Sequence, residues 1–363
     1  MTAARTTGRT RQVFVVMEVT LLLAIPLLGY AGFRTLLDTR SGTFIENPGP
    51  DDPGWLALVD PSPLTTVVEV GDQGTVTGLA VIAELGQTTT GGAVVLIPAE
   101  MVFAEKKLAS LSPVDAAAVV EDILKLRIPA IEVVDAQRWA QLLQDTTYSL
   151  QNPDPVPDAT GAVVFGVGEV EVDGGRAALF LGRTGEGADP LASLVRRELF
   201  WTELLAKPPP IGTDPLGRVL HTVADGPHEV VVVPFARSIG GPPEPLVDEV
   251  EALVNRVVPF PVAGDVGERY QATVEDRTGS ADLDQIARNL AGRGVEVVAI
   301  ANGSVFDNAL TAVRVSPEFT GREALSEFFS GIPVVTDVSM SPSDPVVLQL
   351  GPDFQQALEL VVP

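Results

Sequence analysis

The side chains that could carry chemistry are scattered arginines and carboxylates rather than one compact motif. Arg183 stands among glycines, a composition that fits either a binding loop or the mobile end of a hairpin. Arg196 and Arg197 are adjacent on a predicted helix, where guanidinium groups could bind an anion. The simpler interpretation is a solvated helix face on which Arg196, Arg197 and Glu198 form ion pairs.

The remaining reactive side chains do not form a pattern typical of an enzyme. Asp60, Asp72 and Glu100 are interpreted as turn and surface acids rather than Mg²⁺ ligands. The two histidines, His221 and His228, lack the spacing of metal ligands. No serine or threonine has a base visible in the sequence, and neither a Walker loop nor a dinucleotide fingerprint is present. The sequence therefore gives no direct support for a hydrolase or a nucleotide-binding protein.

Composition excludes some classes of partner. The chain has 363 residues, with 48 acidic against 24 basic side chains and a net charge of −24. Nucleic acid is excluded as a partner because it requires a basic surface, and adhesion to an anionic membrane surface is equally disfavoured. Cysteine is absent, so an exported chain of this kind must be stabilised by its hydrophobic cores alone.

Residues 13–37 are apolar over about twenty positions, which is long enough to span a bilayer as a helix. The side chains expected to anchor the chain include Val13, Leu21, Leu22, Leu23, Leu27 and Leu28. The tail 1–12 before this stretch is basic and the chain after it is acidic. The positive-inside rule therefore predicts a single-pass membrane protein with a cytoplasmic N-terminus and an extracytoplasmic chain from residue 41 onward. A cleaved signal peptide, with a weak site near Ala31 and Gly32, is the alternative.

Strand and helix signals alternate after the anchor. A Pro/Gly/Asp-rich stalk occupies 38–54. A layered α/β domain is predicted from 55 to 237, and the apolar run Trp55–Val59 is expected to open it. A linker carrying one helix follows at 238–268. Residues 269–363 predict a second, compact α/β sandwich.

Local signals place several helix and strand ends. Ser112 and Asp135 are predicted to cap helices through their side-chain oxygens. The Asp-Gly-Gly step at 173–175 predicts a β-hairpin between strands at 163–172 and 177–181.

Three features of the last domain are shared with a known family. A strand over 270–275 leads into a turn with Thr278 and Gly279, and the helix and strand at 283–297 read LDQIARNLAGRGVEV. The closing sequence at 347–354 is VLQLGPDF. Together these resemble the LytR C-terminal domain. The family's Asn-Gly step is absent, so one turn is expected to differ.

The first domain resembles the LytR-CpsA-Psr catalytic domain, which the LytR C-terminal domain often follows in actinobacteria. The resemblance rests on VVLIPAEM at 94–101, on the helix–strand–helix pattern at 119–143, and on VDGGRAALFLGRTGEGADPLASLVRRELFWTELL at 172–205. The order and spacing of these segments agree with the family.

The resemblance implies a site that is incomplete. Enzymes of this family move a glycopolymer from a polyprenyl-pyrophosphate carrier onto peptidoglycan, using clustered arginines and aspartates with a divalent cation to meet the pyrophosphate charge. Ala99 and Ser193 stand where two of the family's arginines are expected. Arg183, Arg196 and Arg197 remain as candidate vestigial phosphate-binding residues.

The resulting expectation is a non-catalytic binding or scaffold protein of the cell envelope, linked to glycopolymer attachment or peptidoglycan maintenance. Its expected partners are peptidoglycan, polyprenyl-linked glycans or an active ligase of the family, with the plasma membrane bound through the N-terminal helix. No cofactor is expected. A divergent active phosphotransferase using Mg²⁺ is the first alternative, and a structural spacer is the second.

Overall fold

A computed structural model describes residues 48–354 except positions 72, 87, 88, 145, 186, 187, 190, 240, 266 and 330. The described residues from Pro50 onward belong to one compact unit. The predicted membrane anchor at 13–37 lies outside the described residues. None of the helices in the described part of the chain is long and apolar enough to cross a membrane.

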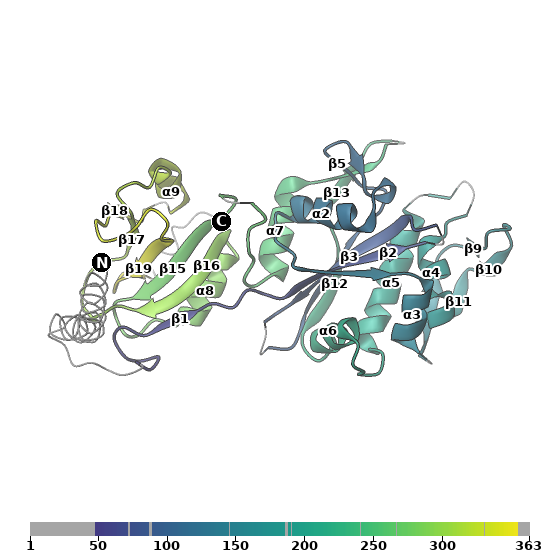
Figure 1. The fold of residues 1–363 in the computed structure, drawn as a ribbon, viewed down its shortest axis with the longest axis horizontal. Helices are drawn as coiled ribbons and strands as arrows, with labels where there is room; N and C mark the ends of the chain where they lie inside the picture. Colours follow the sequence, from purple (N-terminus) through teal and green to yellow (C-terminus); the bar gives the residue numbers. More distant parts are fainter. Residues whose placement is uncertain are drawn as a thin grey trace, which may run out of the picture. The chain divides into compact units, whose positions relative to one another are not determined.

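The first part of this unit is built on a five-stranded sheet with the order β12-β4-β3-β2-β7 (Figure 1). Its strands are β2 (Leu64–Val70), β3 (Val76–Glu84), β4 (Gly92–Ile97), β7 (Ala130–Val134) and β12 (His228–Val232). β3 is antiparallel to both of its neighbours, whereas β2 pairs with β7 and β4 with β12 in parallel. The four parallel strands therefore end at the same edge of the sheet.

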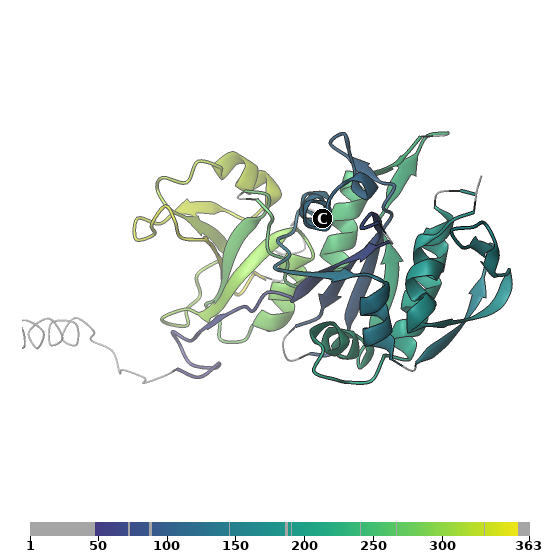
Figure 2. The same ribbon diagram turned by 45° about the vertical axis from the view of Figure 1, so that its right-hand side comes forward.

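Helices cover both faces of this sheet, as Figure 2 shows. Successive strand residues point to opposite faces, so in β4 Val95 and Ile97 join one core while Val94 and Leu96 join the other. The first core contains α2 (Pro113–Leu124) and α7 (Val247–Val257). The second contains α3 (Ala136–Leu143), α4 (Gly174–Gly182), α5 (Ala192–Ala206) and α6 (Pro215–Ala224). The predicted layered α/β fold is confirmed.

Four short strand pairs and one 3-10 helix lie outside the five-stranded sheet in the described part of this domain. The pairs are β5 (Val102–Phe103) with β6 (Lys106–Lys107), β8 (Thr147–Asn152) with β11 (Gly168–Asp173), β9 (Val156–Pro157) with β10 (Val163–Phe165), and β13 (Phe235–Arg237) with β14 (Pro243–Pro245). The 3-10 helix η1 covers Leu108–Ser110.

Both predicted helix caps are confirmed. The Ser112 hydroxyl accepts a hydrogen bond from the Asp115 amide at 3.2 Å at the start of α2. Asp135 accepts from the Arg138 amide at 2.7 Å at the start of α3. Each cap satisfies an amide that the helix itself leaves unpaired.

The predicted hairpin at 173–175 is wrong. Asp173 caps α4 by accepting from the Arg176 amide at 3.0 Å, so residues 174–182 form a helix rather than a returning strand. Strand β11 pairs instead with β8, which precedes it in the chain. Gly174 allows α4 to approach α3 closely, since a Cβ there would lie 2.8 Å from the Ala140 Cα.

The helix predicted to lie in a linker at 238–268 belongs to the first domain. Val250, Leu253, Val254 and Val257 give α7 an apolar face, and all four side chains are buried in the core that contains α2. The linker interpretation is wrong because Pro and Gly residues on either side of a helix show only where regular structure is interrupted. They do not show which domain the helix packs against.

The second sheet has six strands in the order β1-β16-β15-β19-β17-β18. They are β1 (Leu56–Leu58), β15 (Tyr270–Asp276), β16 (Val295–Asn302), β17 (Ala312–Val315), β18 (Val334–Thr336) and β19 (Val346–Leu350), with the helices α8 (Leu283–Ala291) and α9 (Arg322–Phe328). Residues 55–59 do not open the first domain as predicted. β1 pairs antiparallel with β16, and Trp55, Ala57 and Val59 pack against the C-terminal core.

Asp276 organises the turn at which the Asn-Gly step is missing. Its Oδ1 accepts from both the amide and the hydroxyl of Thr278 at 2.7 Å, and its Oδ2 accepts from the Ala281 amide at 3.0 Å. Aspartate commonly stabilises such turns by bonding the backbone that follows it.

Candidate functional site: an arginine pair at the edge of the sheet

Charged side chains gather where the parallel strands of the first sheet end. Glu69 lies near the end of β2, Thr77 near the start of β3, and Glu100 shortly after β4. Helix α5 supplies Ser193 and Arg197 from the layer above. Ligands of open α/β sheets bind at the carboxyl edge of the strands, so this is where a functional site is expected on geometry.

Arg197 is fully buried, and each of its three guanidinium nitrogens donates to a protein oxygen. Nε donates to Glu69 Oε2 at 2.7 Å and Nη1 donates to Ser193 Oγ at 2.8 Å. Nη2 donates to the carbonyl oxygen of Thr77. Glycine at position 78 makes room for this arrangement, because a Cβ there would lie 2.0 Å from Arg197 Nε.

Glu69 is the buried counter-charge of Arg197. Only 2% of the residue is exposed, and its second oxygen accepts from Trp201 Nε1 at 3.3 Å. Buried glutamates are rare unless they are paired. Sequence reasoning missed Glu69, although a single charge within the apolar strand LTTVVEV was a signal that a buried partner exists.

Arg196 is equally buried but reaches a different part of the domain. Its Nε donates to the carbonyl oxygen of Phe180 at 2.8 Å, and its Nη1 and Nη2 donate to Asp154 and to the carbonyl oxygen of Arg183. The guanidinium also lies 5.9 Å from the centre of the Phe180 ring. Burial lowers the pKa of Arg196, and the Asp154 carboxylate opposes part of that effect.

These positions correct the interpretation of α5 as a solvated face. Arg196 and Arg197 are both at 0% exposure, whereas Glu198 is exposed as expected. Arg183 is the residue that follows α4, and its carbonyl oxygen binds Arg196. The structure thus brings Arg196 to the main chain of Arg183 and turns Arg197 toward Glu69. A phosphate-binding role for the three arginines stays a prediction.

Glu100 lies beside this pair at the edge of the sheet. Burial raises the pKa of its carboxyl group, while hydrogen bonding by its own amide and the charges of Arg197 and Lys107 act in the opposite direction. The charge of Asp189 adds to the increase. Asp189 itself accepts from Arg237 Nη1 at 2.8 Å.

The acids at this edge do not fit a divalent cation. Both oxygens of Glu69 are engaged by Arg197 and Trp201, and Glu100 faces positive charge from Arg197 and Lys107. Asp60 is exposed, and Asp72 lies outside the described residues. Within the described ranges, no group of three or more His, Asp and Glu side chains is placed to hold a metal ion.

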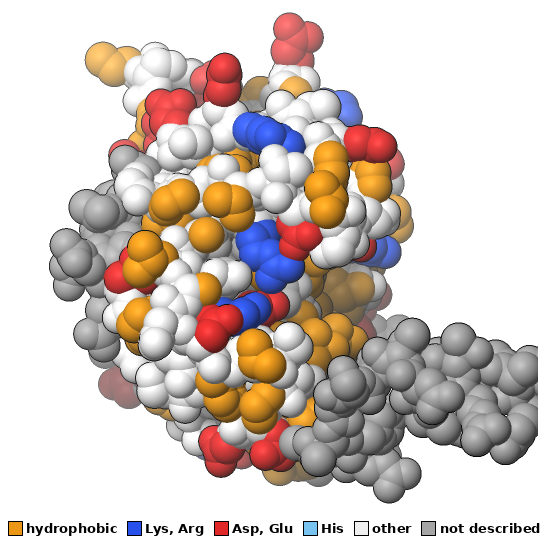
Figure 3. All heavy atoms as spheres, turned by 90° about the vertical axis from the view of Figure 1, so that its left-hand side faces the viewer, with side chains coloured by type: hydrophobic (Ala, Val, Ile, Leu, Met, Phe, Trp, Pro, Cys, Tyr) orange, Lys and Arg blue, Asp and Glu red, His pale blue; other side chains and the backbone are white. Residues whose placement is uncertain are grey.

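Another network of charges lies on the C-terminal sheet. The Glu275 carboxylate accepts hydrogen bonds from Arg277 Nη1 at 3.3 Å and from Arg314 Nη1 at 3.5 Å. Arg314 Nε donates to Asp337 at 2.9 Å. Hydrogen bonds from Ser339 and Arg314 hold the pKa of Asp337 well below its usual range. Figure 3 shows Lys and Arg side chains in the middle of a face of the molecule with Asp and Glu side chains beside them. Because the network compensates its own charge, it offers little to a charged ligand.

Comparisons with known proteins give a likeness of fold. No protein-family model matches the sequence, and no curated protein does. Similar solved structures include a LytR-Csp2A-Psr enzyme from Actinomyces oris, 14% identical over 58% of this chain and 96% of that chain, with a TM-score of 0.38. TagV from B. subtilis is 11% identical over 53% and 94%, with a TM-score of 0.39. TagT bound to LIIa-WTA is 11% identical over 59% and 92%, with a TM-score of 0.40. At these scores the likeness concerns the general fold and carries nothing about activity.

Proposed function

We propose that this protein is a non-catalytic binding or scaffold protein of the cell envelope. In this proposal residues 13–37 hold it in the membrane, and its two folded domains bind cell-wall material outside the cytoplasm. The observation that carries the proposal is the burial of Arg196 and Arg197 with protein acceptors on every guanidinium nitrogen.

The chemistry explains why this observation weighs against catalysis. Transfer from a pyrophosphate needs cationic groups that face the charge developing in the transition state, and one such contact is commonly worth about 2.7–4 kcal/mol. An arginine that already donates hydrogen bonds to carboxylate and carbonyl oxygens can bind a substrate only if those oxygens lose their donor. The two arginines therefore stabilise the domain instead of a transition state.

A turnover assay tests this part of the proposal. The purified full-length protein is incubated in detergent with Mg²⁺, a polyprenyl-pyrophosphate-linked glycan and peptidoglycan, and we expect no transfer above background. An active ligase of the LytR-CpsA-Psr family serves as the positive control. Transfer that is abolished by Arg183→Ala or Glu100→Gln, with both variants still folded, would establish the phosphotransferase alternative instead.

Binding and location need their own measurements. Retention of the full-length protein on peptidoglycan sacculi is expected, and its absence, together with failure to capture a ligase or polyprenyl-linked glycan, would leave only the spacer alternative. A reporter fused after Pro363 should be active only outside the cytoplasm. Activity in the cytoplasm would overturn the proposed topology.

A further inference from the structure

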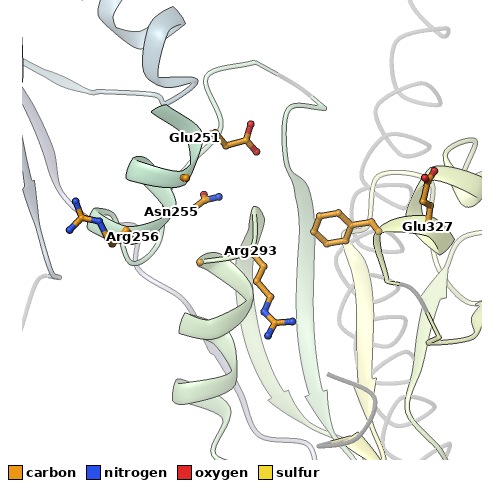
Figure 4. Close-up of a pocket in the computed structure, with 8 residues that line it drawn as sticks. Glu251, Asn255, Arg256, Arg293 and Glu327 are labelled. Carbon is orange, nitrogen blue, oxygen red and sulfur yellow. The ribbon is translucent and has the colours of Figure 1, made fainter. Parts of the chain in front are cut away.

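The helices and strands of the two domains pack little against each other. Within the described residues, no helix or strand of the first domain packs extensively on one of the C-terminal domain. Where α7 faces the ends of α8 and α9, a cavity of about 570 Å³ takes the place of a packed interface (Figure 4). Domains without a large hydrophobic interface are expected to move relative to each other. A fixed orientation therefore requires contacts of another kind.

Two segments connect the domains, and they are hydrogen-bonded to each other. One is 59–63, which follows β1, and the other begins at Val258, directly after α7. The Ser62 amide donates to the carbonyl oxygen of Phe260 at 3.0 Å, and the Phe260 amide donates to Ser62 Oγ at 3.1 Å. Ser62 is buried, so water does not compete strongly for these two bonds.

The segment after α7 is fixed to the first domain by its main chain. Leu126 and Ala263 form an antiparallel bridge. Main-chain hydrogen bonds of 3.0 and 3.3 Å on either side of this bridge join 125–127 to 262–264. Neither bond uses the amide of Ala263, which is therefore available to a partner outside the first domain.

Glu296 of the C-terminal domain accepts that amide. Glu296 lies in β16 and is only 7% exposed. Its Oε2 accepts from the Ala263 amide at 3.0 Å, and its Oε1 accepts from Gln271 Nε2 at 3.0 Å. Hydrogen bonds to a charged acceptor are stronger than neutral ones, and a buried site strengthens them further. Glu296 thus joins the C-terminal sheet to a segment that is fixed to the first domain.

Arg269 forms a second bond between the domains. It immediately precedes β15 of the C-terminal sheet, and its Nη2 donates to Oδ1 of Asn255 on α7 at 2.7 Å. Burial lowers the pKa of Arg269, and the carboxylates of Glu251, Glu296 and Glu268 oppose that effect. The guanidinium therefore interacts with acids of both domains, Glu251 on α7 and Glu296 on β16.

We propose that Glu296 and Arg269 are positioning residues that fix the orientation of the C-terminal domain relative to the first domain. The two domains then meet a binding partner as one rigid body, and the cavity between them keeps a constant width. The inference concerns the arrangement of the domains and does not depend on which cell-wall component the protein binds.

Pulsed electron paramagnetic resonance of the full-length protein in detergent tests the proposal. Because the chain has no cysteine, Ala118→Cys on α2 and Ser326→Cys on α9 place one spin label on each domain, both at exposed positions. The distances between the labels should form a single narrow peak. Loss of one hydrogen bond to a charged group shifts the equilibrium between orientations by about tenfold. Glu296→Ala combined with Asn255→Ala should therefore replace the narrow peak by a broad distribution.

Gln271→Ala combined with Asn289→Ala is the matched control. Gln271 bonds Glu296 from the neighbouring strand of the same sheet, and Asn289 is exposed on α8. Both side chains belong to the C-terminal domain, so the narrow peak should persist. Ala263→Pro combined with Asn255→Ala removes the same two interdomain bonds while leaving Glu296 in place, because proline has no amide hydrogen. This pair should give the broad distribution even if Glu296→Ala weakens β16.

Circular dichroism establishes that each variant is folded. A broad distribution in the wild type, or a narrow peak in the variants that lose both interdomain bonds, overturns the proposal. A control as broad as the Glu296→Ala pair also overturns it, because the effect would then come from the C-terminal sheet itself. Asn255→Ala alone leaves every buried carboxylate unchanged and should add a minor second population. Its absence would overturn the role of Arg269.

Discussion

Arg196 and Arg197 are neighbours in the chain, yet α5 directs their guanidinium groups to separate parts of the domain. A helix turns about 100° per residue, so adjacent side chains cannot share one set of partners. Arg197 reaches Glu69 near the end of β2, and Arg196 reaches the loop of Asp154. The two adjacent arginines suggest an anion-binding patch in the sequence. In the fold they form two separate buried ion pairs, Arg196 with Asp154 and Arg197 with Glu69.

The buried pair should be costly to break and far less costly to replace. Arg197→Met leaves the Glu69 carboxylate buried without its counter-charge, which should lower the free energy of unfolding by about 3–5 kcal/mol. Replacing both members, as Arg197→Met with Glu69→Leu, should recover most of that loss because the unpaired charge is gone. Urea denaturation of each variant measures the differences.

The exposed Arg176–Asp173 pair supplies the control. Both side chains are more than 40% exposed, so Arg176→Met should cost no more than about 1 kcal/mol. A loss in Arg197→Met as small as that in Arg176→Met would mean that the Arg197–Glu69 pair is solvated in solution.

Glu100 should make stability depend on pH in a definite direction. Burial raises the pKa of Glu100 above its ordinary value of 4.5, so the folded chain holds this proton more tightly than the unfolded chain does. Stability is then lost as pH rises from 4.5 through the higher folded pKa, because ionisation is opposed only in the folded state. Glu100→Gln stays neutral, and it should be more stable than the wild type at neutral pH, with the difference vanishing below pH 4.5.

Urea denaturation at a series of pH values measures this difference. Glu198→Gln, at an exposed position on α5, controls for loss of a carboxyl group. A wild type that is more stable than Glu100→Gln at neutral pH would show that attraction to Arg197 and Lys107 outweighs burial.

The residue types of this site could be predicted from the sequence, but their partners could not. Arg183, Arg196 and Arg197 stand out in the sequence, whereas the bond between Arg197 and Glu69 joins residues 128 positions apart. No local pattern specifies a contact at that separation. The resemblance to the LytR-CpsA-Psr domain predicts arginines where the sequence has Ala99 and Ser193, so an incomplete site is a prediction that the sequence alone supports.

Helices and strands were predicted correctly where the local sequence fits only one structure, and incorrectly where it fits two. Ser112 and Asp135 begin helices because a side-chain cap precedes an apolar repeat. Asp173 followed by two glycines fits a hairpin turn as well as a helix start. Packing of α4 on α3 decides between them, and packing is a tertiary contact that the local sequence does not contain.

The two glycines after Asp173 should respond differently to alanine. Gly174→Ala places a Cβ about 2.8 Å from the Ala140 Cα, and crowding against backbone should destabilise the domain by about 1–3 kcal/mol. Gly175→Ala meets only the Asp173 Oδ1, at 3.3 Å. It should be neutral or stabilising by up to about 1 kcal/mol because alanine favours a helix.

Thermal unfolding of the two variants measures this contrast. Equal effects at positions 174 and 175 would indicate that α4 does not pack closely on α3, as the hairpin interpretation would have it.

In the unit as a whole, one segment belongs to a different domain from the one that its position in the chain suggests. Residues 56–58 precede the first domain in sequence but pair with 299–301 in the second sheet. Asn302 strengthens the junction by donating to the carbonyl oxygens of Pro50 at 2.7 Å and Asp52 at 2.9 Å. A strand of three residues has too little pattern to predict its partner, so the sequence shows an apolar run at 55–59 but neither the strand nor the sheet that it joins.

This junction changes what is expected of the isolated C-terminal domain. Sequence patterns alone predict that a fragment 265–363 folds independently, because its helices have complete apolar faces. In the structure, Trp55, Ala57 and Val59 also pack on that core. The fragment should therefore be less stable than the same domain in the full chain, since it lacks both an edge strand and an aromatic side chain.

Trp55→Ala in the full-length protein tests the contribution of this segment without truncation. Removing a half-buried aromatic side chain should lower stability by about 1–3 kcal/mol. The amides of Ile300 and Asn302 face β1, and the Asn302 amide donates to the Trp55 carbonyl oxygen at 2.8 Å. These two amides should exchange hydrogen faster because β1 then detaches more often. Leu58→Ala is the matched control, because Leu58 lies in the same segment and is 77% exposed. Hydrogen exchange followed by mass spectrometry resolves the segment. If exchange at Ile300 and Asn302 is the same in wild type, Trp55→Ala and Leu58→Ala, β1 does not hold the second sheet, and the C-terminal domain is independent of the chain before residue 60.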